Sequence, residues 1–541
     1  MDVYVALDLE TTGTDLQRDA IIEIGAVKFN HEGVLDKFVT FVNPQRPIPA
    51  PITDLTGISD EDVADAPPIG ALREAVARFL GDHPLVGHNI SAFDRVFLET
   101  HHIPYGDVIF DTHELAATFL PNIGEYSLRS LLGHFGIENS RPHRALPDAL
   151  AAMALFEALR RHTSGLPGPL LNQLERWLAA CPWTGSLFLA SALRMSQEDG
   201  GPSRPARAAF VAGEVLEPAA SPVLVSAREA VAVLDAAAEQ EGLIAGFERR
   251  PEQIRMLEAV TEAFNNGQQL LVEAGTGTGK SLAYLVPAAI YALRNGSRVV
   301  VSTNTINLQQ QLARKDIPTL QSLLEAAGPD TQLRAAVLKG KGNYLCLRRF
   351  HALQPTPPLP EDEARFLTRL AIWASKTETG DRAELRLRAR EQPLWRRISA
   401  EEANCNSDNC PFVVEGSCFL VRARRRAEAA HLLVVNHALL LADVAIGGRL
   451  LPPYEHLVID EAHHLEEEAT RQFGFQAGEA ELIEFLEGCQ RLAAEIRAES
   501  RRTAAALSRG ASLVGAARAL EEAVERARRH LQQLAAVARS F

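Results

Sequence analysis

Hydrophobic and polar positions near the start of the chain follow the pattern of β-strands. Residues 3–8, 21–29 and 34–42 are rich in Val, Ile and Phe, and turn sequences separate them. Helices are expected where apolar residues then recur three and four positions apart, at 69–80, 91–102, 111–119, 126–135 and 145–163. These strands and helices predict one α/β domain, which ends near His162.

The rest of the chain predicts a second α/β domain behind a linker. Glycine- and proline-rich stretches at 164–168 and 198–207 interrupt the periodicity, so we expect a linker with short helices over 164–245. Further strands, expected to alternate with helices as in a parallel sheet, are predicted at 269–273, 298–302, 432–435 and 456–460. An insertion separates them at about 340–430, and Ala-, Glu- and Arg-rich helix is expected after 465.

Composition bounds these expectations. A chain of 541 residues is too long for one core, so about two to four domains are expected. The net charge of −14 neither supports nor excludes a nucleic-acid partner, because local patches decide such binding. Asp2 stands where a secretion signal carries basic residues, and no apolar run approaches the ~18 residues that span a bilayer. A cytoplasmic protein without a membrane partner is therefore expected.

Four carboxylates and one histidine predict a metal site. Asp8 and Glu10 are one residue apart at the end of a strand, so their side chains share a face. Mg²⁺ or Mn²⁺ suits such all-oxygen ligation, and two ions can activate water and stabilise the leaving oxygen of a phosphodiester. Asp94 opens a helix and can approach the same site. Asp148 follows His143 by five positions, so the imidazole can reach the attacking water while the carboxylate holds metal.

A glycine-rich loop predicts a second phosphate site. It follows an apolar strand, precedes a helix and consists of Ala274, Gly275, Thr276, Gly277, Thr278, Gly279, Lys280 and Ser281. Backbone N–H groups of such a loop close on phosphates, with Lys280 at the β/γ-phosphates and Ser281 on Mg²⁺. Asp460 and Glu461 end another strand, where Asp460 can complete the Mg²⁺ shell and Glu461 can polarise water.

Six cysteines in a chain of this length do not make a disulfide framework. Cys181 and Cys489 stand apart and are expected to be small buried hydrophobes. The others predict a metal site formed by Cys346, Cys405, Cys410 and Cys418. Four thiolates suit either a tetrahedral zinc ion or a [4Fe–4S] cluster, and their spacing does not choose between the two.

Residues 1–163 resemble the DnaQ-like DEDDh family of 3'-5' exonucleases. The match is carried, in order and spacing, by Leu7 to Gly13, Asn89 to Asp94 and His143 to Asp148. Shorter matches are Thr53 to Ile58, Asp111-Thr112 and Tyr126-Ser127-Leu128. The resemblance implies an RNase H-like fold, His143 as general base and nucleotides removed from a 3' end. It also implies two metal ions bound by Asp8, Glu10, Asp94 and Asp148.

The remainder, from about 246 to 541, resembles the DinG-like, XPD-related superfamily 2 helicases. The match is carried by Phe247, Arg250, Gln253, Ser302 to Thr305, Lys339 to Cys346 and Val435 to Leu440. It implies a RecA-like ATP-binding lobe at 246–465, with Gln253 reading adenine, and an arch-like helical segment at 466–541. It also favours iron and sulfur at the four cysteines. A complete helicase of this family has a second RecA-like lobe, so unwinding by a chain that stops at Phe541 is not expected.

The resulting interpretation is a metal-dependent 3'-5' exonuclease joined to an ATP-binding helicase module that is incomplete in this chain. Single-stranded or 3'-ended DNA is the favoured partner, and DNA repair is the expected setting. Two alternatives stay open at this point: an exonuclease that acts on RNA, and a nucleotide-controlled DNA-binding factor. Cleavage of matched DNA and RNA oligonucleotides distinguishes an exonuclease that acts on RNA from one that acts on DNA. ATP-dependent affinity for DNA without shortening of the strand would favour the DNA-binding factor.

Overall fold

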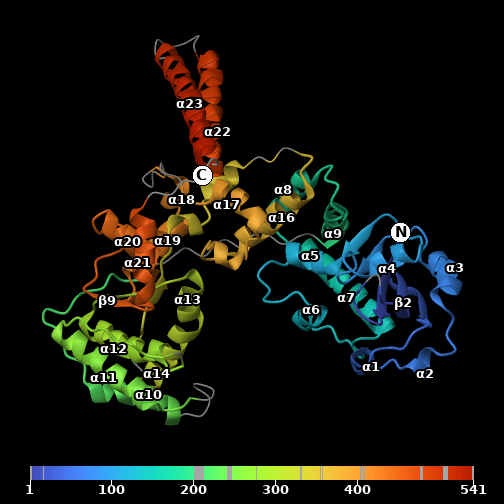
Figure 1. The fold of residues 1–541 in the computed structure, drawn as a ribbon, viewed down its shortest axis with the longest axis horizontal. Helices are drawn as coiled ribbons and strands as arrows, with labels where there is room; N and C mark the ends of the chain where they lie inside the picture. Colours follow the sequence, from blue (N-terminus) through green and yellow to red (C-terminus); the bar gives the residue numbers. More distant parts are fainter. Residues whose placement is uncertain are drawn as a thin grey trace. The chain divides into compact units, whose positions relative to one another are not determined.

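A computed structural model describes most of the chain. The described residues are 3–15, 18–199, 213–239, 247–275, 277–328, 332–353, 355, 357–401, 405, 409–474, 479–503 and 510–538. The chain divides into two compact units, each made of two stretches of sequence (Figure 1). Unit 1 joins Met1–Glu214 to Gly340–Arg426, and unit 2 joins Val215–Lys339 to Ala427–Phe541. No described helix is long and apolar enough to cross a membrane.

Unit 1 contains a mixed five-stranded sheet. Its strands are β1 (Tyr4–Thr11), β2 (Ile21–Asn30), β3 (Gly33–Phe41), β4 (Leu85–Gly87) and β5 (Ile109–Asp111). Their order is β3-β2-β1-β4-β5, with β1, β2 and β3 antiparallel and β1, β4 and β5 parallel. The three expected strands are confirmed. The two short strands were not predicted, because three residues are too few to show alternation.

Helices surround this sheet. They are α1 (Ala50–Thr56), α2 (Asp60–Val63), α3 (Ile69–Leu80), α4 (Asp94–Thr100), α5 (Thr112–Phe119), α6 (Leu128–Phe135) and α7 (Ala145–Ser164). The five expected helices are confirmed as α3 to α7. Helix α7 packs against β1 and β2, and it buries an apolar stripe that includes Leu155, Phe156 and Leu159 (Figure 1). Asp148, one of the predicted metal ligands, lies in the first turn of this helix.

The segment expected to be a linker contains three helices that pack into the cores of the units. They are α8 (Gly168–Leu178) and α9 (Gly185–Asp199) in unit 1, and α10 (Ala227–Glu239) in unit 2. The breaker residues lie outside or at the ends of these helices; Pro167, for example, is the N-cap of α8. Burial of Leu170, Leu174 and Trp177 on one face shows why the helical pattern prevails between the breakers.

The cysteine-bearing insertion also folds into unit 1. Its helices are α15 (Leu347–Ala352), α16 (Glu361–Lys376), α17 (Gln392–Ile398), α18 (Pro411–Val414) and α19 (Phe419–Glu428), of which α19 reaches into unit 2. Helix α16 packs on α5 and α8. At this contact Trp183 stacks on Phe119 at 5.9 Å between ring centroids and donates a hydrogen bond to Glu114. Arg365 of α16 pairs with the same carboxylate at 2.7 Å.

Unit 2 contains a parallel four-stranded sheet of order β7-β8-β6-β9. Its strands are β6 (Val299–Thr303), β7 (Ala335–Val337), β8 (Leu432–Asn436) and β9 (His456–Ile459). The expected parallel arrangement is confirmed for β6, β8 and β9. Besides α10, the helices of the unit are α11 (Pro251–Asn266), α12 (Lys280–Asn295), α13 (Ile306–Gln311), α14 (Ile317–Ala327), α20 (His437–Ala445), α21 (Leu465–Phe473), α22 (Glu479–Thr503) and α23 (Gly510–Ala538). The last two lie side by side as a long hairpin (Figure 1).

The strand predicted at 269–273 is wrong. These residues adopt no regular structure, and the side chains of Leu270 and Leu271 are 45% and 92% exposed. A strand forms where a neighbour supplies backbone partners, and among the described residues the sheet ladders do not include this segment. A short apolar run therefore indicated a strand that the surrounding structure does not form.

Candidate functional site

The first candidate site begins with the alternation of β1. Asp8 and Glu10 project from one face of this strand, while Leu7 and Leu9 enter the core on the other face, where they are 1% and 4% exposed. Two carboxylates on one face of a strand repel each other unless a cation lies between them. The local structure thus sets up a group of like charges.

Helix α7 brings Asp148 to this face because β2 has a glycine where the helix approaches. Gly25 lies opposite Asp8 in the antiparallel ladder. A Cβ atom at Gly25 would lie 2.2 Å from the carbonyl carbon of Ala145, at the start of α7. Only glycine therefore allows the helix to come close enough to place Asp148 beside the strand.

Glu23 and Arg144 fix the start of α7, and the sequence reasoning missed both. Glu23 is 2% exposed, and its carboxylate pairs with the Arg144 guanidinium at 2.6 Å and accepts the backbone N–H of Ala145 at 2.9 Å. Glu23 also lies opposite Glu10 in the sheet. The available signal was a charged residue inside the apolar strand run Ile21-Ile22-Glu23-Ile24.

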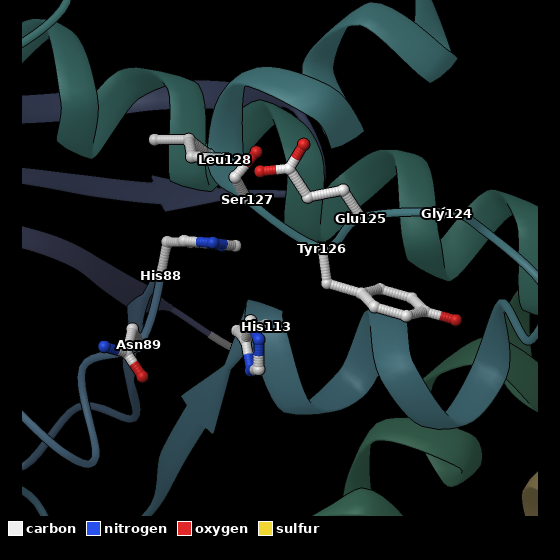
Figure 2. A pocket seen from close by; sticks show the side chains of 8 residues that line it. All are labelled: His88, Asn89, His113, Gly124, Glu125, Tyr126, Ser127 and Leu128. Atoms are coloured by element: carbon white, nitrogen blue, oxygen red, sulfur yellow. The ribbon is translucent and has the colours of Figure 1, made fainter. Parts of the chain in front are cut away.

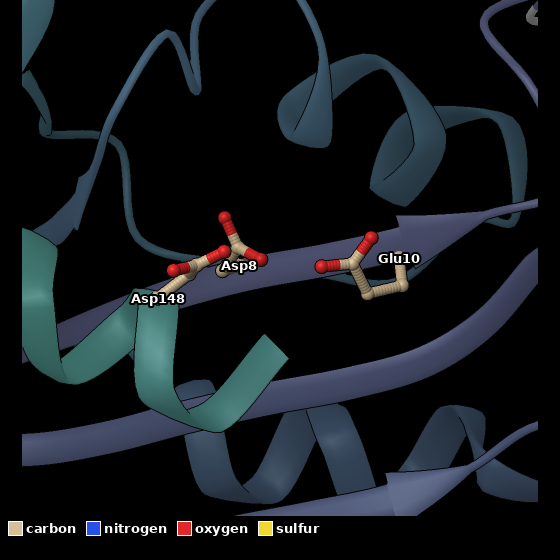
Figure 3. A group of neighbouring side chains, drawn as sticks. All are labelled: Asp8, Glu10 and Asp148. Atoms are coloured by element: carbon tan, nitrogen blue, oxygen red, sulfur yellow. The ribbon is translucent and has the colours of Figure 1, made fainter. Parts of the chain in front are cut away.

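Three of the four predicted carboxylates converge. Asp8, Glu10 and Asp148 each offer a ligand atom, and these atoms all lie within 4.8 Å of one another. Figure 3 shows the Asp148 carboxylate reaching from the first turn of α7 toward Asp8, with the Glu10 carboxylate turned toward both. Oxygen ligands at this spacing fit Mg²⁺ or Mn²⁺.

Burial and mutual repulsion shape the electrostatics of this group. Burial raises the pKa of Glu10 to about 8, and the charges of Asp148, Glu23 and Asp94 add to the rise. Burial raises the pKa of Asp94 to about 7, and the pKa of Asp8 is raised well above its usual value by burial and by Asp94. A bound cation would favour the ionised forms, so the donor set fits a divalent metal.

Asp94 and His143 lie beside the three converging carboxylates but do not belong to that group. Asp94 is 2% exposed at the start of α4, and its Oδ1 accepts the backbone N–H of Leu9 at 2.9 Å. His143 has φ +61° and an exposed side chain, and its backbone N–H donates to Asp148 Oδ2 at 2.9 Å. Asn139 also donates to Asp148. The backbone of the His143 loop thereby orients a ligand, while the imidazole stays accessible.

Two glycines of the glycine-rich loop of unit 2 have a left-handed backbone conformation. Gly277 and Gly279 have φ of +82° and +80°, which favours glycine, and Lys280 begins α12. The Thr278 hydroxyl donates to the carbonyl of Gly275 at 3.0 Å. Ala274 lies in the described part of this loop and Ser281 in the first turn of α12, whereas Thr276 lies outside the described residues.

Gln253 contacts this loop directly. It is 4% exposed, and its Nε2 donates to the carbonyl of Gly279 at 2.9 Å. A Cβ atom at Gly279 would lie 2.2 Å from the same nitrogen, so any other residue at this position would displace the glutamine. In this structure Gln253 supports the shape of the loop.

Asp460 and Glu461 lie next to the loop. Lys280 Nζ pairs with Glu461 Oε1 at 3.2 Å, and the Tyr284 hydroxyl donates to Asp460 Oδ2 at 3.2 Å. Burial raises the pKa of Asp460. Glu461 has φ +54°, a strained conformation for a residue with a side chain. Among the described residues, Gln253 therefore contacts the glycine-rich loop, and Glu461 pairs with the lysine that begins α12.

Three of the four predicted cysteine ligands, Cys346, Cys405 and Cys418, lie near enough for the first two to affect the third. Burial raises the pKa of the Cys418 thiol, and the neighbouring charges of Cys346 and Cys405 raise it further. In the described part of the chain, the four predicted thiols do not form a group with metal-ligand spacing. Residues 402–404 and 406–408, which flank Cys405, are outside that part. Cys181 is buried as expected, and Cys489 is partly buried.

Two family matches correspond to these two sites. Residues 5–156 match the RNase T family, described as exonuclease, and residues 250–341 match the DEAD/DEAH box helicase family. The chain is thus an α/β protein with an exonuclease domain ahead of a helicase region. In that combination the chain is similar to DinG-type proteins, in agreement with the resemblance seen in the sequence.

Individual relatives match different shares of this chain. The chain is 32% identical to the 3'-5' exonuclease DinG of Bacillus subtilis, over 88% of this chain and 52% of that protein. It is 37% identical to the ATP-dependent DNA helicase YoaA of Escherichia coli, over 44% of this chain and 37% of that protein. A structure of exonuclease X with 5' overhanging duplex DNA is 26% identical over 31% of this chain and 96% of that chain, at a TM-score of 0.26. The chain spans about half the length, or less, of these two curated relatives.

Proposed function

We propose that the chain is a metal-dependent exonuclease that removes nucleotides from the 3' end of a DNA strand. The convergence of Asp8, Glu10 and Asp148 within 4.8 Å carries this proposal, because such an acidic group is stable in its ionised form only with bound cations. The name of the Bacillus relative supports the 3'-5' direction. The match to the exonuclease family over 5–156 supports the reaction class.

The roles proposed for the predicted site residues are those that the resemblance to DEDDh exonucleases implies. Asp8, Glu10, Asp94 and Asp148 would hold two Mg²⁺ or Mn²⁺ ions in an RNase H-like domain. These ions, when bound, lower the pKa of a water and offset charge on the leaving oxygen. The exposed imidazole of His143 takes the proton of the attacking water as general base. Glu23 and Arg144 act as positioning residues, because they hold the first turn of α7 against β2.

The second part of the proposal assigns ATP and Mg²⁺ to the glycine-rich loop. Lys280 would contact the β- and γ-phosphates, Ser281 and Asp460 would bind Mg²⁺, and Glu461 would polarise water. Lys280 must then exchange its ion pair with Glu461 for the phosphates. We assign this role to a RecA-like lobe at 246–465, followed by an arch-like segment at 466–541, with the exonuclease domain at 1–163.

DNA is favoured over RNA as the substrate, and DNA repair as the setting. The Escherichia relative, which matches the helicase region, is named a DNA helicase. Both parts of the chain would then act on the same polymer. Parallel digestion of DNA and RNA oligonucleotides of one sequence tests this choice, with faster loss of DNA expected and faster loss of RNA contradicting it.

The third part of the proposal places a [4Fe–4S] cluster on Cys346, Cys405, Cys410 and Cys418. Cys346 and Cys405 lie near enough to Cys418 to raise the pKa of its thiol, which supports a common site, and the resemblance to DinG-like helicases favours iron over zinc. Anaerobically purified protein should contain about four iron atoms per chain and absorb visible light. Serine variants of the four predicted cysteines should lose this iron. Cys181→Ser is their matched control and should keep it, because this buried cysteine lies outside the predicted set.

The proposed reaction is tested with single-stranded DNA labelled at either end. With Mn²⁺ the native chain should release the 3' label as mononucleotide at once and shorten the 5'-labelled strand stepwise. Asp8→Ala should lose this activity by at least about 10³-fold, because a shared ligand is removed. Lys280→Ala, in the other phosphate site, is the matched control and should keep it. Release of the 5' label first, or equal activity of Asp8→Ala, would refute the proposal.

A further inference from the structure

A cavity of about 500 Å³ lies in unit 1 outside the carboxylate group. Figure 2 shows it between the end of β4, the start of α5 and the loop before α6. Its lining includes the rings of His88, His113 and Tyr126, together with Asn89 and Glu125. Tyr126 belongs to the Tyr126-Ser127-Leu128 match noted in the sequence, which the proposed chemistry does not use. The volume lies within the ordinary range of small-molecule sites.

Three rings form the wall of this cavity in edge-to-face contact. The rings of His88 and His113 are 5.7 Å apart at 79°, and those of His113 and Tyr126 are 6.3 Å apart at 76°. Such a wall offers ring faces and edges to a flat aromatic ligand. The nitrogens of the His113 ring have no hydrogen-bond partner among the described residues, so they can bind the edge of a base.

The wall is held in place before any ligand arrives. His88 Nδ1 lies 3.0 Å from the Thr112 hydroxyl, and the Tyr126 hydroxyl donates to the carbonyl of Leu120 at 3.0 Å. Arg386 of the insertion donates to the carbonyl of Gly124 at 2.8 Å, which fixes the loop from the other side. A preorganised wall loses little conformational freedom on binding.

Two lining residues of the cavity follow strand ends at the same edge of the sheet as the carboxylates. In the parallel ladders, Val86 of β4 lies opposite Ala6 of β1, and Gly87 lies opposite Asp111 of β5. His88 and His113 therefore follow the strand ends at the level where Asp8 follows Leu7. Adjacent strands are about 4.8 Å apart, so β5 lies about 10 Å from β1. An extended nucleic-acid strand covers this distance with one or two nucleotides.

The charge of the cavity suits a neutral base better than a phosphate. None of its lining residues is Lys or Arg. Burial and the neighbouring His113 lower the pKa of His88 to about 4, so this ring is neutral at physiological pH. The Glu125 carboxylate in the lining disfavours an anion. Single-stranded nucleic acids are held in such places by stacking of bases on aromatic side chains.

We propose that this cavity is a base subsite of the exonuclease, which receives a base upstream of the 3'-terminal nucleotide while the phosphodiester lies at Asp8 and Glu10. The inference rests on the proposed exonuclease function. It assigns to His113 and Tyr126 a role in binding the nucleic-acid strand and no role in the hydrolysis of the phosphodiester. Affinity for a strand, and not the reaction itself, should then depend on these two rings.

The test compares a long and a minimal substrate in the full chain. Oligothymidylate can reach the cavity, whereas the p-nitrophenyl ester of thymidine 5'-monophosphate has no upstream base. His113→Ala and Tyr126→Ala should raise the ratio of KM for the oligonucleotide to KM for the ester by about 5- to 150-fold. Tyr126→Phe, which keeps the ring, should restore most of the lost affinity. His31→Ala, at an exposed turn, is the matched histidine control and should keep the native ratio.

Single abasic nucleotides locate the base. An abasic site at one upstream position should raise the KM of the native chain by the same factor and have no added effect in His113→Ala. A native KM that no abasic position changes, or a KM ratio that neither alanine variant changes, would overturn the inference. Equal loss on both substrates would also overturn it, because it would indicate general damage. A native chain that cleaves neither substrate would instead refute the proposed function.

Discussion

At the scale of single residues, the proposed nuclease site is a place where folding works against electrostatics. Asp8, Glu10 and Asp148 are brought together by a strand, a glycine contact and an ion pair, although their charges repel. Their raised pKa values report this conflict. Sites that bind ligands commonly retain such destabilising groups.

Glu10→Gln should therefore stabilise the metal-free chain at alkaline pH. The pKa of Glu10 is raised from 4.5 to about 8, so its contribution to stability is fully present below about pH 4.5 and is lost as pH rises through about 8. Glutamine removes that loss. Thermal unfolding with EDTA should show the variant more stable by on the order of 1 kcal/mol near pH 8, and equal to native near pH 4.5. A variant less stable than native near pH 8 would contradict this electrostatic account.

Lys280→Ala should separate the two phosphate sites. A charged hydrogen bond contributes about 1.5–3 kcal/mol, so ATP affinity should fall by about 10- to 100-fold. Gln253→Ala should weaken ATP binding less, because it loosens the Gly279 carbonyl and contacts no phosphate. Calorimetric titration with ATP and Mg²⁺ measures both. Equal affinity of native and Lys280→Ala chains would argue against the assigned loop.

Some of these site residues can be predicted from the sequence, and others cannot. Alternation along β1 places Asp8 and Glu10 on one face, and the helical pattern after His143 places Asp148 in a first turn. The Glu23–Arg144 pair joins residues 121 positions apart, and no local pattern connects them. Contacts between distant segments follow from the fold, which periodicity alone does not give.

At the scale of elements, long amphipathic helices were predicted well and short or context-dependent segments were not. Helix α3 has the expected bounds of 69–80, because its apolar spacing repeats over three turns. The three-residue strands β4 and β5 are too short for a period. The segment 269–273 has the apolarity of a strand, yet its backbone joins no described ladder. Pairing partners, which decide strands, lie far away in sequence.

Helices α8 and α9 should be structural parts of unit 1, as their burial shows. Trp183 is 2% exposed between Phe119 and Glu114, so Trp183→Ala should cost about 3–5 kcal/mol of unfolding free energy. Leu187→Ala, on α9 with a side chain 50% exposed, is the control and should stay within about 0.5 kcal/mol. Urea unfolding followed by tryptophan fluorescence measures the first transition. Similar effects of both substitutions would show that the segment between α8 and α9, which contains Trp183, does not pack as described.

At the scale of the whole molecule, the insertion belongs to the unit of the exonuclease domain. Residues 340–426 interrupt the helicase region in sequence, yet they fold with residues 1–214. Arg365 and Trp183 meet on Glu114, and Trp177 lies edge-to-face with Phe350 of the insertion. From the sequence, the insertion was predicted to belong to the helicase lobe, because it lies within that lobe in chain order. Chain order does not show which hydrophobic core a discontinuous segment joins.

Loss of the proposed cluster should accordingly disturb the exonuclease unit more than the ATP site. Helix α16 of the insertion packs against α5. Cys418→Ser should therefore increase the rate of amide hydrogen exchange in both helices by about tenfold or more. ATP affinity should stay within about twofold of native. Cys489→Ser, on α22 of unit 2, is the control. Increased exchange confined to α12 and the glycine-rich loop would contradict the placement of the insertion.

The central claim is that metal ions on Asp8, Glu10 and Asp148 contact the phosphodiester that is cut, and a sulfur substitution tests it most directly. A DNA strand with one phosphorothioate linkage, in each stereoisomer, is digested from its 3' end in Mg²⁺ and in Mn²⁺. Sulfur is a poor ligand for Mg²⁺ and a better one for softer metals. The account predicts that one isomer halts digestion in Mg²⁺ and is cut in Mn²⁺. Passage through both isomers at the unmodified rate in Mg²⁺, or a halt that Mn²⁺ does not relieve, would contradict it.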